Sequence, residues 1–356
     1  MSLSSLSKIL EDTLLFKQVQ EAVQANQANV RVQIISEAVP FSVASLYRAT
    51  NLPMFILASR PDESRRIFEQ IRLWTDEDPF VLHLSETETL PFERLVPDAD
   101  TIHQRLNTLT TILRATIEHR PFIVVSSTNA LTQKTISRVA LENNQQTLQI
   151  GKTINLKEML ALWNRMGYAV ESTVDVPGLV SRRGGIVDIF PPSAKSPSRI
   201  EFWGNKIESI RNFDPDTQLS TEFVDSVTVV PARETLPGLT NPERLDMAIS
   251  KIDLGSCNSK TRSQMMNELD SLRDGREIED LEFYTGVLNQ ASIFEYLPKD
   301  TVFIQYKPNE IIEAAWATEE ENHNIRSAKE SRGELPYNFP SSHLLWSEIQ
   351  EGTQTF

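Results

Sequence analysis

Cysteine and histidine are scarce in this chain. Its 356 residues include one cysteine, Cys257, and five histidines. A single cysteine allows no internal disulfide, and the scattered histidines offer no pair at the spacing of metal ligands. We therefore expect neither a disulfide framework nor a metal site.

Long apolar runs are also missing. No stretch reaches the roughly 18 apolar residues that a transmembrane helix needs. The first twenty residues, MSLSSLSKILEDTLLFKQVQ, place acids within an amphipathic pattern, unlike the charged and then apolar regions of a signal peptide. These absences predict a soluble, cytoplasmic protein without membrane contact.

Positive charge is in short supply. Lys and Arg total 35 against 49 Asp and Glu, which gives a net charge of -14. Binding to DNA or anionic lipid needs basic residues that displace counterions, so the sequence argues against non-specific binding to DNA or to anionic lipid. The basic residues nevertheless gather in one short segment, as Arg182, Arg183, Lys195, Arg199, Lys206 and Arg211.

Strands and helices alternate in residues 1–145 after a helical start that ends near Gln27. Helical periodicity is present in residues 61–74 and 100–116, and the second helix is expected to carry Arg105 on a solvated face. Such alternation with short links predicts parallel βαβ units. The expected strands are VRVQII (30–35), PMFILAS (53–59), FVLHLSE (80–86) and PFIVVSS (121–127).

Residues 146–230 follow a different pattern. One helix, NLKEMLALWNRMGY, precedes short strands that are separated by Gly, Pro and Asn turns, which is typical of an antiparallel α+β unit. From residue 231 to 356 the composition is helical again, with a polar, turn-rich stretch over about 319–340. The late apolar strand TVFIQY (301–306) is expected to complete the first sheet, which would make the α/β domain split in sequence.

The chemistry of a nucleotide-binding α/β domain is absent. After the expected strand 30–35 the chain reads SEAVPF, with no glycine and no lysine for a phosphate loop. Glu37 would repel phosphate, and Pro40, which precedes Phe41, removes an N–H donor. Tyr306 and Lys307 stand after the late strand, where an ATPase places acids that hold magnesium. No catalytic residues are predicted.

Five stretches stand out in chain order: ETLPFERLVPDADTIHQRLNTL, RRGGIVDIFPP, RIEFWGNKIESIRNFDPDT, FYTGVL and LPKDTVFI. Taken together, they resemble the amino-terminal module of the bacterial transcription-repair coupling factors (the Mfd family), which is similar to the first domains of the excision-repair protein UvrB. The resemblance covers about residues 30–345 and is most specific over 183–217. It implies a degenerate P-loop NTPase-like parallel-sheet domain, like UvrB domain 1, with an inserted α+β UvrA-binding domain.

Two departures from UvrB favour the coupling-factor module. SEAVPF replaces a working P-loop, and the short LPFERLVPDAD, with Phe92 as its one aromatic, replaces the hairpin that clamps DNA in UvrB. The resemblance implies an amino-terminal part of a longer protein, with ATP and magnesium used in its motor domains and no cofactor here. RNA polymerase and DNA would be met through other domains. The alternative is a DNA-handling ATPase domain of UvrB type.

The resemblance also implies that the inserted segment binds UvrA. The matching positions are Arg183 in the Arg-Gly turn, Arg199 on the next strand and, as a departure from phenylalanine, Trp203. Strand alternation supports this, because Arg199 and Trp203 share one face of SRIEFW. Arg182 and Lys206 are expected at the rim of this UvrA-binding surface.

Two alternatives remain open at the inserted segment. Trp203 could pack on the segment's own helix while Arg199 pairs with Glu201 or Glu208. The inserted segment could also be masked by the translocase or carboxy-terminal domains of the same polypeptide. Asp188, in the middle of GGIVDIF, is expected to be structural.

Overall fold

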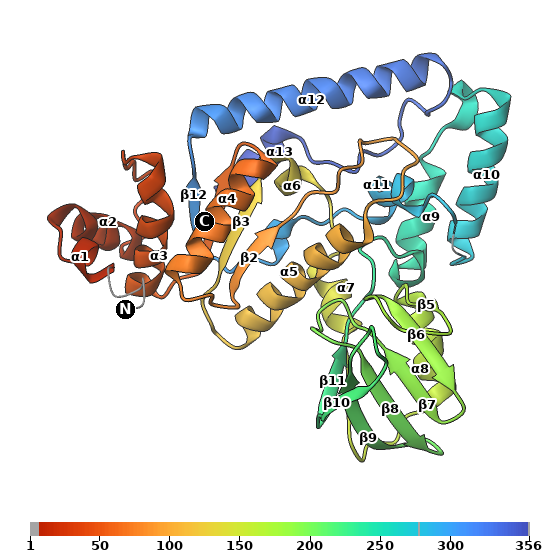
Figure 1. Cartoon of the computed structure of the whole chain (residues 1–356). Helices are drawn as coiled ribbons and strands as arrows, with labels where there is room; N and C mark the ends of the chain where they lie inside the picture. Colours follow the sequence, from red (N-terminus) through yellow and green to blue (C-terminus); the bar gives the residue numbers. More distant parts are fainter. Residues whose placement is uncertain (1–6, 277, 355–356) are drawn as a thin grey trace.

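The computed structural model describes residues 7–276 and 278–354. Its first sheet is parallel and mixes strands from both ends of the chain (Figure 1). The late strand pairs with the first one in register, Met54 opposite Val302, so the prediction that it joins this sheet is confirmed. In spatial order the strands are β12 (Val302–Gln305), β1 (Met54–Ala58), β3 (Ile123–Ser127) and β2 (Val81–Leu84).

Helices cover both faces of the parallel sheet, because alternate side chains of each buried strand point to opposite sides. Met54 and Ile56 of β1 pack with one group of helices, and Phe55 and Leu57 with the other. The first group comprises α2 (Leu14–Gln24), α3 (Val39–Thr50) and α4 (Pro61–Trp74). The second comprises α5 (Ala99–Ile117), α6 (Thr128–Thr132), α7 (Arg138–Asn143), α12 (Pro308–Ser331) and α13 (Trp346–Thr353). A short helix α1 (Ser7–Glu11) precedes them.

The expected strand at 30–35 does not form. The residues are exposed and unpaired coil, with Ile35 71% exposed, and a single helical turn η2 (Ser36–Ala38) leads from them into α3. The alternation of VRVQII is typical of a strand with one covered face, but in this structure neither face has a partner. SEAVPF, which was expected to lie in a loop, instead forms this turn and the start of α3.

Residues 146–230 form two antiparallel units. A six-stranded sheet has the order β10-β9-β8-β7-β6-β5, and β4 pairs with β11. The pairing is antiparallel except between β5 and β6, which confirms the predicted antiparallel character. The elements are β4 (Gln146–Gln149), α8 (Leu156–Arg165), β5 (Ala169–Val170), β6 (Leu179–Arg183), β7 (Ile186–Ile189), β8 (Ser198–Trp203), β9 (Lys206–Phe213), β10 (Ser220–Phe223) and β11 (Ser226–Val229).

A helical cluster follows this segment and packs around Phe92, which lies in the LPFER turn with a left-handed φ of 64°. Arg94 of the same turn holds the cluster through Glu268, at 2.8 Å, and Asp280, at 3.1 Å. The elements of the cluster are α9 (Pro242–Ser250), η4 (Leu254–Ser256), α10 (Ser259–Arg273), η5 (Leu281–Tyr284) and α11 (Thr285–Leu288). The short turns η3 (Pro237–Leu239) and η6 (Ile293–Glu295) pack instead with the core that includes α5.

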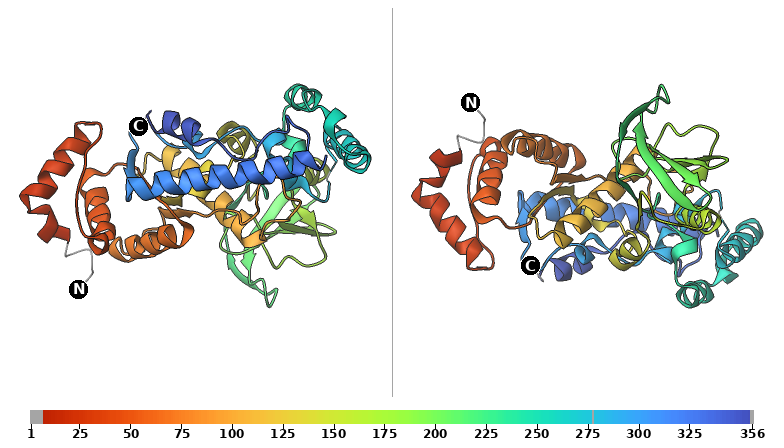
Figure 2. Two further views of the ribbon diagram at one scale, coloured as in Figure 1. Left: turned by 90° about the horizontal axis from the view of Figure 1, so that it is seen from above. Right: turned by 90° about the horizontal axis from the view of Figure 1, so that it is seen from below.

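Helix α12 is longer than expected. It reaches Ser331 and spans from the end of β12 to the neighbourhood of α10 (Figures 1 and 2), whereas a turn-rich stretch was predicted from about residue 319. Residues 309–331 contain no glycine or proline, and Arg326 pairs with Glu330 at 2.8 Å, so the polar composition is compatible with an exposed helix. Among the described helices, none is long and apolar enough to span a bilayer.

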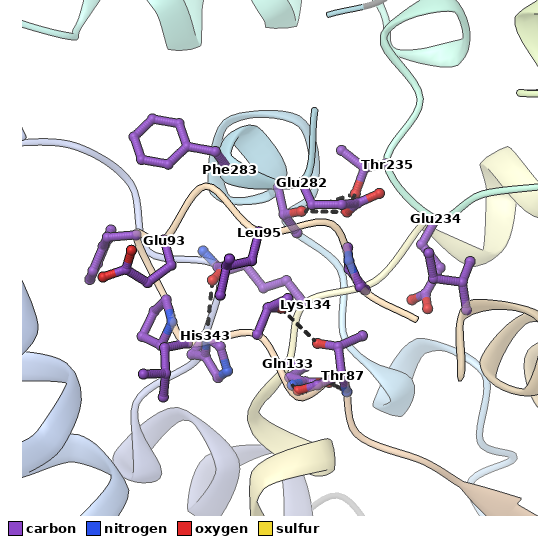
Figure 3. A pocket seen from close by; sticks show the side chains of 18 of the residues that line it. Thr87, Glu93, Leu95, Gln133, Lys134, Glu234, Thr235, Glu282, Phe283 and His343 are labelled. Carbon is purple, nitrogen blue, oxygen red and sulfur yellow. Dashed lines mark hydrogen bonds between the residues drawn. The ribbon is translucent and has the colours of Figure 1, made fainter. Parts of the chain in front are cut away.

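The chain just after the inserted segment is held against α5 by a buried ion pair. Arg105 was expected on a solvated helix face, but its side chain is only 3% exposed and contacts Glu234. A cavity of about 60 Å³ lies beside this pair, and Figure 3 shows Thr87, Glu282 and His343 around it. Ligand pockets typically measure about 300 to 1,000 Å³, so this junction is too small for a nucleotide.

Candidate protein-docking surface

The six-stranded sheet has two faces of different character. Its inner face carries apolar side chains such as Val187 and Ile200, both fully buried against α8 residues that include Trp163. These contacts build the core of the segment, so the inner face is committed to folding. We call the opposite side the outer face.

Cross-strand register identifies the outer-face residues. Two rows cross the strands β6, β7, β8 and β9, and directly opposed residues point to the same side. The burial of β8 alternates as the sequence predicts, with Ile200 and Phe202 buried and the intervening side chains partly or fully exposed. The rows are Ser181, Asp188, Arg199, Arg211 and, two residues nearer the turns, Arg183, Ile186, Glu201, Ser209.

Arg183 ends β6 on the outer face and is exposed. Its Nη2 donates a hydrogen bond of 2.6 Å to the Ser172 carbonyl. The two glycines that follow make a tight hairpin turn: Gly184 has a φ of +65°, and a Cβ on Gly185 would lie 2.8 Å from the Phe202 carbonyl oxygen. The turn therefore sets β7 close to β8 and leaves Arg183 at the edge of the turn.

Arg199 lies on the outer face but is not free. Its Nε and Nη2 donate to the two carboxylate oxygens of Asp188 at 2.7 and 2.9 Å, and the guanidinium lies 4.7 Å from the Phe213 ring centroid. These hydrogen bonds to Asp188 raise the pKa of Arg199. Pairing with Glu201 or Glu208 was the open alternative. Glu201 instead pairs with Arg211.

Trp203 ends β8 beside the hairpin turn at Gly204 and Asn205. Its side chain is 77% exposed, so it does not pack on α8 as the open alternative required. Lys206 is opposite it across the hairpin and is also exposed. Trp and Arg are enriched in binding hot spots, and Trp203 lies on the same face of the sheet as Arg183 and Arg199.

The predicted rim residues separate in space. Lys206 lies beside Trp203, whereas Arg182 is opposite Val187, in a row of the inner face, and donates to the Gly184 carbonyl at 3.2 Å. Arg182 thus points away from Arg183, because successive side chains of a strand alternate.

Two outer-face residues of β7 were not recognised as part of the site from the sequence. Ile186 is 37% exposed between Arg183 and Glu201, and Asp188 is 4% exposed against Arg199. The period-2 pattern of GGIVDIF places both on one face, so the signal was present. The cross-strand partners depend on register, which the pattern alone does not reveal.

The residues expected at a degenerate nucleotide position lie in η2, at the start of α3 and directly after β12. Glu37 is exposed in η2, Pro40 is buried in the first turn of α3, and the Phe41 ring lies 4.7 Å from that of Trp74. Tyr306 is buried in the core that includes α3.

An ion pair occupies the carboxyl ends of β1 and β12, the edge at which parallel α/β sheets bind ligands. Lys307 Nζ lies 2.9 Å from Glu63 Oε1, and the Ser59 hydroxyl donates to Glu63 Oε2 at 3.0 Å. Within residues 7–276 and 278–354, no three His, Cys, Asp or Glu side chains group as metal ligands.

Comparison with known proteins identifies the inserted segment. Residues 147–234, which contain the whole outer face, match the family model described as the UvrB interaction domain. The chain is 28% identical over 357 aligned positions to the transcription-repair-coupling factor of Myxococcus xanthus, with 96% of this chain and 29% of the relative covered. The chain is a relative of the transcription-repair coupling factors.

Other coupling factors support the same relationship. The Bacillus subtilis protein is 27% identical over 274 residues, covering 73% of this chain and 23% of the relative. The Escherichia coli protein is 26% identical over 212 residues, covering 60% and 18%. The resemblance predicted from the sequence is thereby confirmed, and the chain spans about a quarter of the length of these coupling factors.

Proposed function

We propose that this chain is a non-catalytic adaptor, the amino-terminal module of a transcription-repair coupling factor, that recruits UvrA in transcription-coupled nucleotide excision repair. The observation that carries the proposal is the exposed outer face, with Trp203 and Arg183, within the segment that matches the UvrB interaction domain. Its inner face is already filled by α8, which leaves the exposed part of the outer face for a partner.

The proposal divides the chain into residues 1–145 and 231–356, which form a UvrB-like α/β domain, and the UvrA-interaction domain 146–230. The α/β domain would be a degenerate P-loop fold. The Glu63–Lys307 ion pair supports this, because it neutralises the cation at the edge where nucleotide phosphates bind. ATP and magnesium would act in the motor domains of the complete protein, and RNA polymerase and DNA would be met through other domains. The location would be cytoplasmic.

Three side chains are proposed to contact UvrA. Trp203 would fill an apolar pocket, and Arg183 has most of its guanidinium fork available for a carboxylate or a carbonyl. Arg199 would contribute the N–H groups that Asp188 does not take. Lys206 would steer an acidic partner from the rim.

The test is the affinity of the 356-residue chain for purified UvrA, measured by surface plasmon resonance. The wild-type chain is expected to bind, and Trp203→Ala and Arg183→Ala are expected to weaken binding while melting like the wild type. Arg273→Ala, on the exposed surface of α10, is the matched control. Wild-type binding that all three folded variants Arg183→Ala, Arg199→Ala and Trp203→Ala retain would refute the site, and no binding at all would refute the function.

A measurement of nucleotide binding distinguishes the adaptor from the alternative, a DNA-handling ATPase domain of UvrB type. ATP with magnesium is expected to leave the melting temperature of the chain unchanged, and no phosphate release is expected with or without DNA. A melting temperature that rises with ATP concentration would favour the ATPase and count against the adaptor.

A further inference from the structure

The carboxylate of Asp188 is an unusual group on the outer face, because it is nearly buried on the side of the sheet that also carries the exposed Arg183 and Trp203. Its side chain is 5% exposed, against 20% for Arg199. Ser181, opposite Asp188 on β6, is also buried and donates to the Ser172 carbonyl. Asp188 therefore cannot present a wide surface to a partner. Its carboxylate accepts hydrogen bonds from Arg199 instead.

Arg199 is held from three directions. Asp188 binds one edge of the guanidinium through two hydrogen bonds, and the Phe213 ring covers one face of the group. A third, longer contact of 3.4 Å joins Nη1 to the Gln218 carbonyl. A planar guanidinium with one edge and one face occupied has a single orientation.

The surroundings show that this orientation is built into the fold. Phe213 belongs to a small buried cluster with Val174 and Phe190 that covers one end of the outer face. Gln218 is anchored in turn, because its Nε2 donates to the Val174 and Pro215 carbonyls at 3.1 and 2.7 Å. Arg199 thus lies at the border between the covered and the exposed parts of the outer face.

We propose that Asp188 is a positioning residue for docking, which acts by holding Arg199 in the orientation that the partner meets. This inference rests on the proposed UvrA-docking function. Asp188 takes the Nε and Nη2 edge of the guanidinium, so the N–H groups that Arg199 has left for a partner are on Nη1 and on the other side of Nη2. These groups can donate to a backbone carbonyl or to a carboxylate.

The preorganisation of Arg199 by Asp188 predicts how much UvrA affinity is lost when Asp188 is replaced. A side chain that is already ordered loses less conformational freedom on binding, so Asp188→Asn is expected to weaken UvrA binding about tenfold. Asp188→Glu keeps both acceptor oxygens and is expected to recover part of the loss. Arg199→Lys cannot form the paired hydrogen bonds and is expected to bind like Arg199→Ala.

The experiment is a double-mutant cycle in the 356-residue chain, with UvrA affinity and melting temperature measured for each variant. Asp188→Asn should weaken binding in the wild-type background and have no further effect beside Arg199→Ala. The Arg199 Nε–H signal in nitrogen NMR should be sharp in the wild type and broadened in Asp188→Asn. Glu222→Gln, which removes a carboxylate bonded to Asn212 on the same sheet, is the matched control and should bind like the wild type.

The outcomes separate the two proposals. Folded Asp188→Asn with wild-type affinity, or with higher affinity because Arg199 is released, would overturn the positioning role while leaving UvrA docking intact. If Asp188→Asn weakens UvrA binding as much in the Arg199→Ala background as in the wild type, Asp188 acts through the fold and not through Arg199. If Asp188→Asn does not fold, Asp188→Glu decides, since a folded variant that stays as weak as Arg199→Ala would contradict positioning. A wild-type chain that does not bind UvrA overturns both proposals.

Discussion

Arg105 Nε lies 2.6 Å from Glu234 Oε1, and this pair joins helix α5 to the residues that follow the inserted segment. Arg105 also donates to the Ser85 carbonyl at 2.7 Å and to Gln133 Oε1 at 3.1 Å. One side chain therefore links three segments that are distant in the sequence.

Loss of Arg105 should be costly. Arg105→Met leaves the Glu234 carboxylate, 11% exposed, without its counter-charge, which typically costs about 3 to 5 kcal/mol of unfolding free energy. Urea denaturation followed by fluorescence measures this change in unfolding free energy. Arg273→Met, which breaks an ion pair between side chains 41% and 65% exposed, is the control and should cost less than about 1 kcal/mol. Equal losses in the two variants would contradict this account of the junction.

The two glycines of the β6–β7 turn should respond differently to alanine. Gly185→Ala forces a Cβ against the Phe202 carbonyl oxygen, a backbone atom that cannot rotate away, so a loss of about 1 to 3 kcal/mol is expected. Gly184→Ala meets no atom and is penalised only by its φ of +65°, about 1 kcal/mol. Gly184→Asn should be milder, since asparagine tolerates that conformation. Urea unfolding ranks the three, and an equal cost for the two alanine variants would be the contrary result.

Trp203 and Trp163 should separate binding from stability. Trp203→Ala is expected to change the unfolding free energy by less than about 0.5 kcal/mol, because the ring is 77% exposed, but to weaken UvrA binding at least about 30-fold. Trp163→Ala, in a fully buried position, should cost about 3 to 5 kcal/mol. Calorimetry with and without UvrA measures both quantities. A Trp203→Ala variant that melts much earlier than the wild type would mean that the ring is part of the fold.

His343 should make stability depend on pH. Burial, followed by the charges of Arg105 and Lys134, lowers the pKa of His343 to about 4, below its ordinary value near 6.5. Between these values the unfolded chain binds the extra proton, so this contribution is complete above pH 6.5 and is lost as the pH falls toward 4. Comparing urea unfolding of the wild type and His343→Gln at pH 7 and pH 5 should show a difference of about 1 to 2 kcal/mol in pH sensitivity. Identical pH profiles would exclude this histidine as the cause.

Apolar runs were sufficient to predict most of the parallel sheet. The strands β1, β2 and β3 are short, apolar and mostly buried, and β12 is short, apolar and partly buried, so local composition determines them. VRVQII at 30–35 has the same kind of pattern and forms no strand, because a strand also needs an edge to pair with, and the sequence does not say whether that edge is present.

The sequence was sufficient to predict which side chains of the candidate surface share a face, but not which side chains pair with one another across the strands. Alternation in SRIEFW correctly placed Arg199 and Trp203 on one side. The Asp188–Arg199 pair depends on the register of β7 against β8, which is set by the loop of residues 190–197 between the strands. For the same reason Arg105 was misplaced, since its partner Glu234 is 129 positions away in the chain.

The sheet of the inserted segment has one face filled by α8 and an opposite face that is open at Arg183, Ile186 and Trp203. Substitutions on the open side at Arg183, Ile186 and Trp203 can therefore change which molecule is recognised without unfolding the segment. Randomising those three positions and selecting for new targets would make this sheet a scaffold for engineered adaptors, with specificity altered independently of the core.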